Sequence, residues 1–143
     1  MRLFFKFFTL FVFGWLLTAC SQKPTEEQTR YFRNSAANTE YIRISSHADS
    51  GDSLDLRIES FEDVFKFRME IELDRIHPAG RQVGEYDITF VSSSGHEFMV
   101  NYSLEENRIR FQNPWDIEGT PYSSFPILLK KHLEAYEKGK SQD

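Results

Sequence analysis

The sequence has a single cysteine and no excess of positive charge. One thiol excludes a disulfide within the chain, so packing alone must stabilise the fold. Its 22 acidic side chains outnumber its 17 lysine and arginine side chains. Nucleic acids and anionic lipid surfaces attract clustered positive charge, so this balance argues against both as partners of the folded part.

The sequence also lacks a long hydrophobic run. Its most apolar segment, residues 7–19, has 13 residues, whereas a helix that spans a bilayer needs about 20. Arg2 and Lys6 precede this segment, and the small residues Thr18 and Ala19 close it. A positive start, a short apolar middle and a small-residue end are typical of an export signal.

The only cysteine, Cys20, follows this segment directly. The stretch Leu17-Thr18-Ala19-Cys20 resembles the lipobox of bacterial lipoproteins. The resemblance implies removal of residues 1–19 as a lipoprotein signal peptide, a diacylglycerol on the Cys20 thiol and usually a further acyl chain, such as palmitate, on the new amine. Ser21 stands where inner-membrane retention commonly uses aspartate, which implies the periplasmic face of the outer membrane in a Gram-negative cell.

Residues 20–39 are predicted to be the lipidated N-terminus and a tether. A flexible chain of this length reaches roughly 25 Å, enough to hold a domain clear of the lipid headgroups. Thr25 and Gln28 match a capping box, which favours a short helix within the tether. Tyr31 and Phe32 would then dock on the domain or form an added strand. The remaining residues, 40–143, fit one globular domain.

Alternation of apolar and charged residues dominates this domain. It is most regular from Phe65 to Leu73 and also marks 42–44, 54–58, 86–90, 98–104 and 109–111. Alternation predicts strands with one buried and one wet face, which are typical of antiparallel sheets. Because turn-forming segments separate them, we expect a six-stranded antiparallel meander, curved or partly closed.

The last segment changes to a helical period. Apolar residues recur at three- and four-residue spacing from Phe125 to Tyr136, and Pro126 suits a first turn. The predicted fold class is therefore α+β, with a C-terminal helix packed on the sheet. A complete small barrel is the structural alternative.

Residues that could carry chemistry are scattered. The four histidines, at 47, 77, 96 and 132, show no paired spacing of the kind found in zinc sites. Ser92, Ser93, Ser94 and His96 lie together but lack the glycines of a nucleophile elbow, so they indicate a turn. We predict no catalytic residue, metal or cofactor, and no enzymatic activity.

The connection at residues 112–124 is the most suggestive part of the domain. Connections longer than about 12 residues are often functional, and this one contains Trp115, Ile117 and Tyr122. Exposed aromatic side chains are frequent anchors of interfaces, so these three are the candidate partner-binding residues. Alternatively, Trp115 and Tyr122 fold back and plug the end of the sheet against the helix.

The expected function is that of a lipid-anchored, non-enzymatic cell-envelope protein that binds another protein. It would be an accessory subunit of an envelope assembly, or an inhibitor or immunity protein. The first alternative is a binder of a lipid or other apolar ligand inside a curved sheet, based on five inward-facing aromatic residues: Phe65, Phe67, Phe90, Phe98 and Tyr102. A hydrolase is the third possibility, and would need His, Asp or Ser gathered in a pocket.

Overall fold

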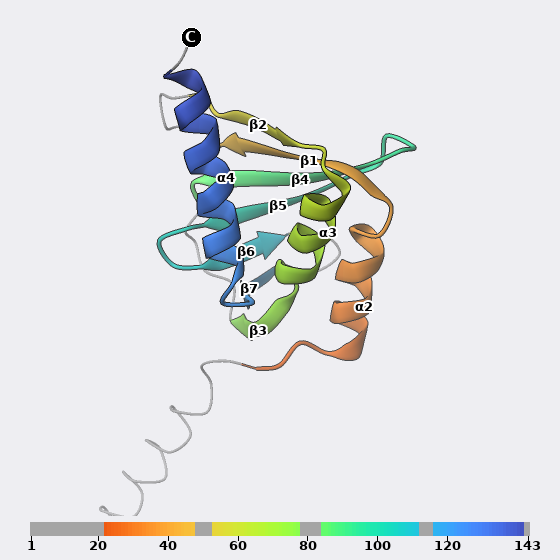
Figure 1. Cartoon of the computed structure of the whole chain (residues 1–143). Helices are drawn as coiled ribbons and strands as arrows, with labels where there is room; N and C mark the ends of the chain where they lie inside the picture. The colour runs from red at the N-terminus through yellow and green to blue at the C-terminus, as the bar shows by residue number, and fades with distance from the viewer. Residues whose placement is uncertain (1–21, 48–52, 78–83, 112–115, 142–143) are drawn as a thin grey trace, which may run out of the picture.

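A computed structural model describes residues 22–47, 53–77, 84–111 and 116–141. Within these ranges one antiparallel sheet carries three helices on one face (Figure 1). The strands are β1 (Thr39–Ser46), β2 (Asp55–Ile58), β3 (Leu73–His77), β4 (Tyr86–Ser92), β5 (Glu97–Ser103), β6 (Arg108–Phe111) and β7 (Ile117–Pro121). The helices are α2 (Glu26–Ser35), α3 (Phe61–Glu70) and α4 (Phe125–Lys140). The predicted α+β class, antiparallel sheet and C-terminal helix are confirmed.

The strand order across the sheet is β2-β1-β4-β5-β6-β7-β3. Only β4 to β7 form a meander, and β3 pairs with β7 at the edge opposite to β2. Helix α3 makes the connection from β2 to β3. The sheet therefore has seven described strands where six were expected, and its edge strands β2 and β3 are not paired to close a barrel.

Strand β7 lies inside the segment that was expected to be a long connection. It pairs with β6 and β3 on its two sides. A Cβ atom at Gly119 would lie 2.6 Å from the Arg75 carbonyl oxygen of β3, so the close approach of these two strands requires glycine there.

The prediction of a strand from Phe65 to Leu73 is wrong, because most of this segment is helix α3. Ser60 caps the helix by accepting a hydrogen bond from the Asp63 backbone N–H at 3.4 Å. The residues buried against the sheet, Val64, Phe67 and Ile71, are spaced three and four apart, which is the helical period. Alternating apolar residues therefore fall on opposite faces of α3 instead of one face of a strand.

Helix α2 confirms the predicted capping box and changes the role of its segment. Gln28 N–H donates to Thr25 Oγ1 at 3.2 Å, and Thr25 N–H donates to Gln28 Oε1 at 2.8 Å. Phe32 is buried in the core, and Gln22 exchanges two backbone hydrogen bonds of 3.0 and 2.7 Å with Ile76 of β3. From Gln22 onward, the segment expected as a tether is packed on the domain.

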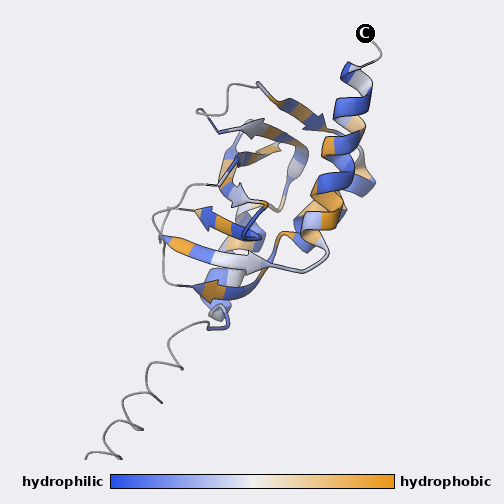
Figure 2. Cartoon of the chain, turned by 90° about the vertical axis from the view of Figure 1, so that its left-hand side faces the viewer, coloured by the Kyte–Doolittle hydropathy of each residue, from blue (hydrophilic) through white to orange (hydrophobic). Residues whose placement is uncertain are grey.

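One hydrophobic core lies between the sheet and the three helices. Hydrophobic and hydrophilic residues alternate along the strands (Figure 2). The ring of Phe125 from α4 packs edge-on against Tyr102 of β5 and Phe67 of α3, with centroid separations of 5.0 and 5.5 Å. Phe32 makes similar contacts with Phe98 and Phe111. These contacts fix all three helices on the same face of the sheet.

Candidate interaction surface

The residues predicted to bind a partner do not form one surface. Ile117 is buried in β7, whereas Tyr122, between β7 and α4, is 44% exposed. Trp115 and Cys20 lie outside the described residues. Ile117 therefore contributes to the core and not to an interface, and of the two described candidates only Tyr122 faces solvent.

Helix α3 presents an apolar surface that the sequence interpretation missed. Phe61, Phe65 and Met69 are 86%, 51% and 50% exposed, and their four-residue spacing places them on one helix face. We call these three residues the α3 stripe. In Figure 1, α3 lies in the helical layer between α4 and α2, and Met69 at one end of the stripe lines the groove toward α2. The spacing was the available signal, but the alternation hid it.

Charged side chains flank the α3 stripe. On one side, Lys66 Nζ lies 2.7 Å from Glu62 Oε1, four residues earlier in the same helix. Their mutual hydrogen bond lowers the pKa of Glu62 and raises that of Lys66. On the other side is Arg68, whose Nε atom is buried and makes no hydrogen bond to a described residue. The stripe thus has both signs of charge beside it.

A groove of about 370 Å³ separates α3 from α2. Its walls include Phe32, Met69 and Arg68, and the Arg33 and Glu72 side chains cross it. Arg33 donates two hydrogen bonds of 2.7 and 2.8 Å to the carboxylate of Glu72, and this bond raises the pKa of Arg33. Because Glu72 is buried, this pair links α2 to the chain that follows α3.

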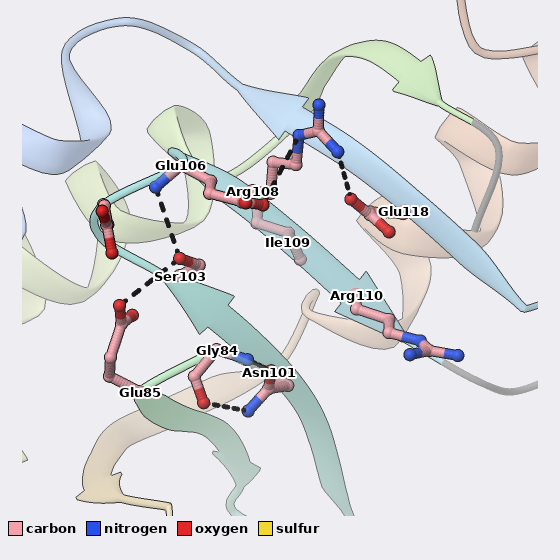
Figure 3. A pocket seen from close by; sticks show the side chains of 10 residues that line it. Gly84, Glu85, Asn101, Ser103, Glu106, Arg108, Ile109, Arg110 and Glu118 are labelled. Atoms are coloured by element: carbon pink, nitrogen blue, oxygen red, sulfur yellow. Dashed lines mark hydrogen bonds and ion pairs between the residues drawn. The ribbon is translucent and has the colours of Figure 1, made fainter. Parts of the chain in front are cut away.

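The opposite face of the sheet has a polar cleft of about 280 Å³ (Figure 3). Arg108 Nη1 donates to Glu118 Oε1 at 2.7 Å. Ser103 Oγ donates to Glu85 at 3.5 Å and accepts from the Glu106 backbone N–H at 3.3 Å. These bonds join the residue before β4 to the end of β5, stabilise the turn after β5, and join β6 to β7. The polar side chains of the cleft thus have a structural role, because they bond to one another between neighbouring strands.

Asn101 lines the same cleft and extends the pairing of β4 with β5. Its side chain accepts from the Gly84 N–H and donates to the Gly84 carbonyl at 3.1 Å. It also donates to Asp87 Oδ1 at 2.9 Å, and the other oxygen of Asp87 lies 3.0 Å from His47 Nδ1. This chain of contacts joins the end of β1 to β4 and β5.

The serine-rich segment is a turn, as predicted. Ser92 and Ser94 hydroxyls are 2.9 Å apart, and Ser92 Oγ accepts from the His96 backbone N–H at 3.0 Å. Gly95 has a φ of 81°, a conformation that glycine adopts readily. Ser92 ends β4 and Asp87 lies near its start, but His96 of this turn lines the same cavity, of about 470 Å³, as the His47–Asp87 pair.

The inward-facing aromatic residues are divided between core and surface. Phe67, Phe90, Phe98 and Tyr102 are buried and packed against other side chains, whereas Phe65 lies in the α3 stripe. The Tyr102 hydroxyl donates to Asn107 Oδ1 at 2.9 Å, and burial raises the pKa of Tyr102. These contacts show the buried four as core residues, and Phe98 also borders the cavity of about 470 Å³ together with Tyr31, Met99 and Phe111.

Among the described residues, no three His, Cys, Asp or Glu side chains are grouped so that they could hold a metal ion. Within the same ranges no helix has the length and hydropathy to cross a membrane. Comparison of the chain with protein-family models, with curated proteins and with solved structures finds no match. Function must therefore be argued from the surface itself.

Proposed function

We propose that this chain is a lipid-anchored, non-enzymatic cell-envelope protein that binds another protein through the α3 stripe. It acts as an accessory subunit of an envelope assembly, or as an inhibitor or immunity protein. Cys20 carries the lipid and, in a Gram-negative cell, the domain stands on the periplasmic face of the outer membrane. The observation that carries the binding function is the exposure of Phe61, Phe65 and Met69 on one helix face.

Physical chemistry supports a binding role for such a surface. Covering a fully exposed Phe or Met side chain is worth about 1.5–3 kcal/mol, and contiguous exposed apolar patches often mark interaction sites. Phe65 is central in the stripe, with one apolar neighbour a helical turn away on each side. Buried aromatic residues near the centre of an interface commonly dominate its binding energy.

Site-specific photo-cross-linking in the native envelope tests the binding function. A photoreactive residue at position 65 should give a protein adduct of defined mass, because the α3 stripe contacts the partner. The control places the same residue at Met99, which is 58% exposed and belongs to β5 on the other face of the sheet. Equal adducts at both positions, or none at position 65, would contradict the proposal.

The lipid anchor has its own test. Cells supplied with a labelled palmitate analogue should incorporate it into the chain, and Cys20→Ser should abolish both the label and recovery in the membrane fraction. Two acyl chains or more give stable attachment, so the wild-type chain should stay membrane-bound in high salt. An unlabelled wild-type chain would refute the lipid anchor without affecting the binding function.

A further inference from the structure

We propose that the α3 stripe docks on the α3 stripe of a second copy of this chain, with the two helices antiparallel about a two-fold axis at Phe65. This inference rests on the proposed function, because it names the partner of the same surface. Two-fold dimers bury the same patch on both subunits, so the patch must be complementary to itself. The stripe meets this condition in its apolar residues and in its charges.

The apolar residues are placed symmetrically about Phe65. Phe61 lies four residues before it and Met69 four residues after it. Antiparallel packing brings Phe65 against its own copy, and brings Phe61 of each chain against Met69 of the other. Sulfur–aromatic contacts of this kind are favourable, and the two-fold axis forms them twice.

The charges select the antiparallel arrangement. At 3.6 residues per turn, Glu62 and Lys66 lie on one flank of the stripe and Arg68 lies on the other. Antiparallel pairing keeps each flank beside the same flank of the second copy. Glu62 then faces Lys66 of the other chain, and Arg68 faces the ring of Phe61, a cation–π geometry. Parallel pairing would instead bring Lys66 toward Arg68 of the other chain, which is repulsive.

Mixed charge also disfavours other occupants of the stripe. An anionic lipid surface would be repelled by Glu62, which follows the most exposed stripe residue, Phe61. A strongly acidic or basic protein would meet one flanking charge of its own sign. A second copy matches both signs at once.

The dimer is compatible with one membrane for both chains. Figure 1 shows α3 running across the strands, so the two-fold axis of an antiparallel pair lies along the strand direction. Gln22 pairs antiparallel to Ile76 of β3, so the chain enters the domain along that same direction. Rotation about an axis leaves directions along it unchanged. At Gln22, both chains therefore enter their domains from the same side of the dimer.

The contact is small. A pair of ten-residue helices buries less than the roughly 1,200 Å² of a standard stable interface. We therefore expect a weak dimer in dilute solution, and the test is made on the full chain in its own membrane.

Disulfide cross-linking of Phe65→Cys tests the dimer. Helices whose axes lie about 8–10 Å apart place facing Cα atoms, each about 2.3 Å from its axis, about 3.4–5.4 Å apart, which overlaps the range that a disulfide spans. Under mild oxidation, Phe65→Cys should give about tenfold more cross-linked dimer than the matched control Met99→Cys, because only position 65 lies within that Cα separation of its own copy. The only native cysteine is Cys20, so the wild-type chain measures the background. Phe65 and Met99 are both more than half exposed, so neither change should impair folding.

Mixed cross-linking tests the antiparallel register. Phe61→Cys alone should give background levels, because the two positions lie about 12 Å apart along the antiparallel helices. Co-expression of Phe61→Cys and Met69→Cys chains that carry different tags should give mixed dimers. Mixed dimers no more abundant than the Phe61→Cys self-dimer would overturn the antiparallel arrangement.

The outcomes separate this inference from the proposed function. If Phe65→Cys cross-links no more than Met99→Cys while the photoreactive residue at position 65 captures a different protein, the second copy is refuted and the protein-binding function stands. If position 65 captures nothing and forms no disulfide, both fail. Efficient cross-linking at both 65 and 99 would indicate random collision and would also overturn the dimer.

Discussion

Phe65 and Phe67 lie two residues apart on α3 and have opposite surroundings. Phe67 is fully buried and packs against the ring of Phe125, whereas Phe65 is half exposed in the α3 stripe. The same residue type therefore serves the core at one position and the surface at the other. The comparison shows that burial on this helix follows its angular position relative to the sheet and not the local hydropathy of the sequence.

The largest expected effect is the difference in the free energy of unfolding between alanine substitutions at Phe67 and at Phe65. Phe67→Ala should destabilise the domain by about 3–5 kcal/mol, because it removes buried contacts and leaves a cavity. Phe65→Ala should change the free energy of unfolding by less than about 0.5 kcal/mol. Denaturant unfolding followed by circular dichroism measures both, and equal losses would mean that Phe65 belongs to the core.

The second effect is a difference in stability loss between two ion pairs, the Arg33–Glu72 pair that joins α2 to the chain that follows α3 and the exposed Glu62–Lys66 pair on α3. Glu72→Ala should lower stability more than Lys66→Ala, because Glu72 is buried and holds Arg33 of α2, whereas water replaces the exposed Glu62–Lys66 contact. Both changes should cost less than Phe67→Ala. Thermal melts rank the three variants, and hydrogen exchange should show faster exchange in α2 for Glu72→Ala only. Protection of α2 that is unchanged in Glu72→Ala would contradict the proposed link.

The smallest effect is a pH dependence at the junction of α3 and α4. His132 is partly buried beside the Phe67 ring, and burial lowers its pKa below the ordinary value of 6.5, although Asp63 at 3.8 Å opposes the shift. The unfolded chain then binds more protons than the folded one, so stability should fall as the pH drops below 6.5 toward the lowered pKa.

A substitution isolates this contribution. His132→Gln cannot gain the charge and should flatten the dependence of the melting temperature on pH in that window. His96→Gln, at an exposed position in the turn after β4, is the matched control for replacing an imidazole by an amide. A slope that survives in His132→Gln would assign it to other groups.

Much of the sheet and two helices follow from local sequence. Strands β4, β5 and β6 were predicted from alternation in the sequence. Buried and more exposed residues do alternate along β5 and β6, whereas Ile88 to Val91 of β4 are all buried. The capping box of α2 and the helical period of α4 are local signals as well. Such elements are predictable when the local pattern and the final burial agree.

The secondary-structure predictions were wrong where contacts with distant parts of the chain decide between a helix, a strand and a turn. The segment from Phe61 to Glu70 carries both an alternating and a helical pattern, and the sheet on which Val64 and Phe67 pack selects the helix. Strand β7 contains Gly119 and Pro121, which local rules place in turns, and pairing with β3 and β6 overrides them. The α3 stripe could not be predicted once its helix was assigned as a strand.

The hydrogen bonds between Gln22 and Ile76 also set how far the domain can move. With the lipid proposed at Cys20, only Ser21 stands between the anchor and Gln22 in the sequence, a span of two Cα–Cα steps or at most about 7 Å. A sheet of seven described strands is about 30 Å across, so under this proposal the domain would turn over its anchor without lifting clear of the bilayer. Its collisions would then be confined to a layer one domain thick, where encounter would depend on lateral diffusion in the membrane.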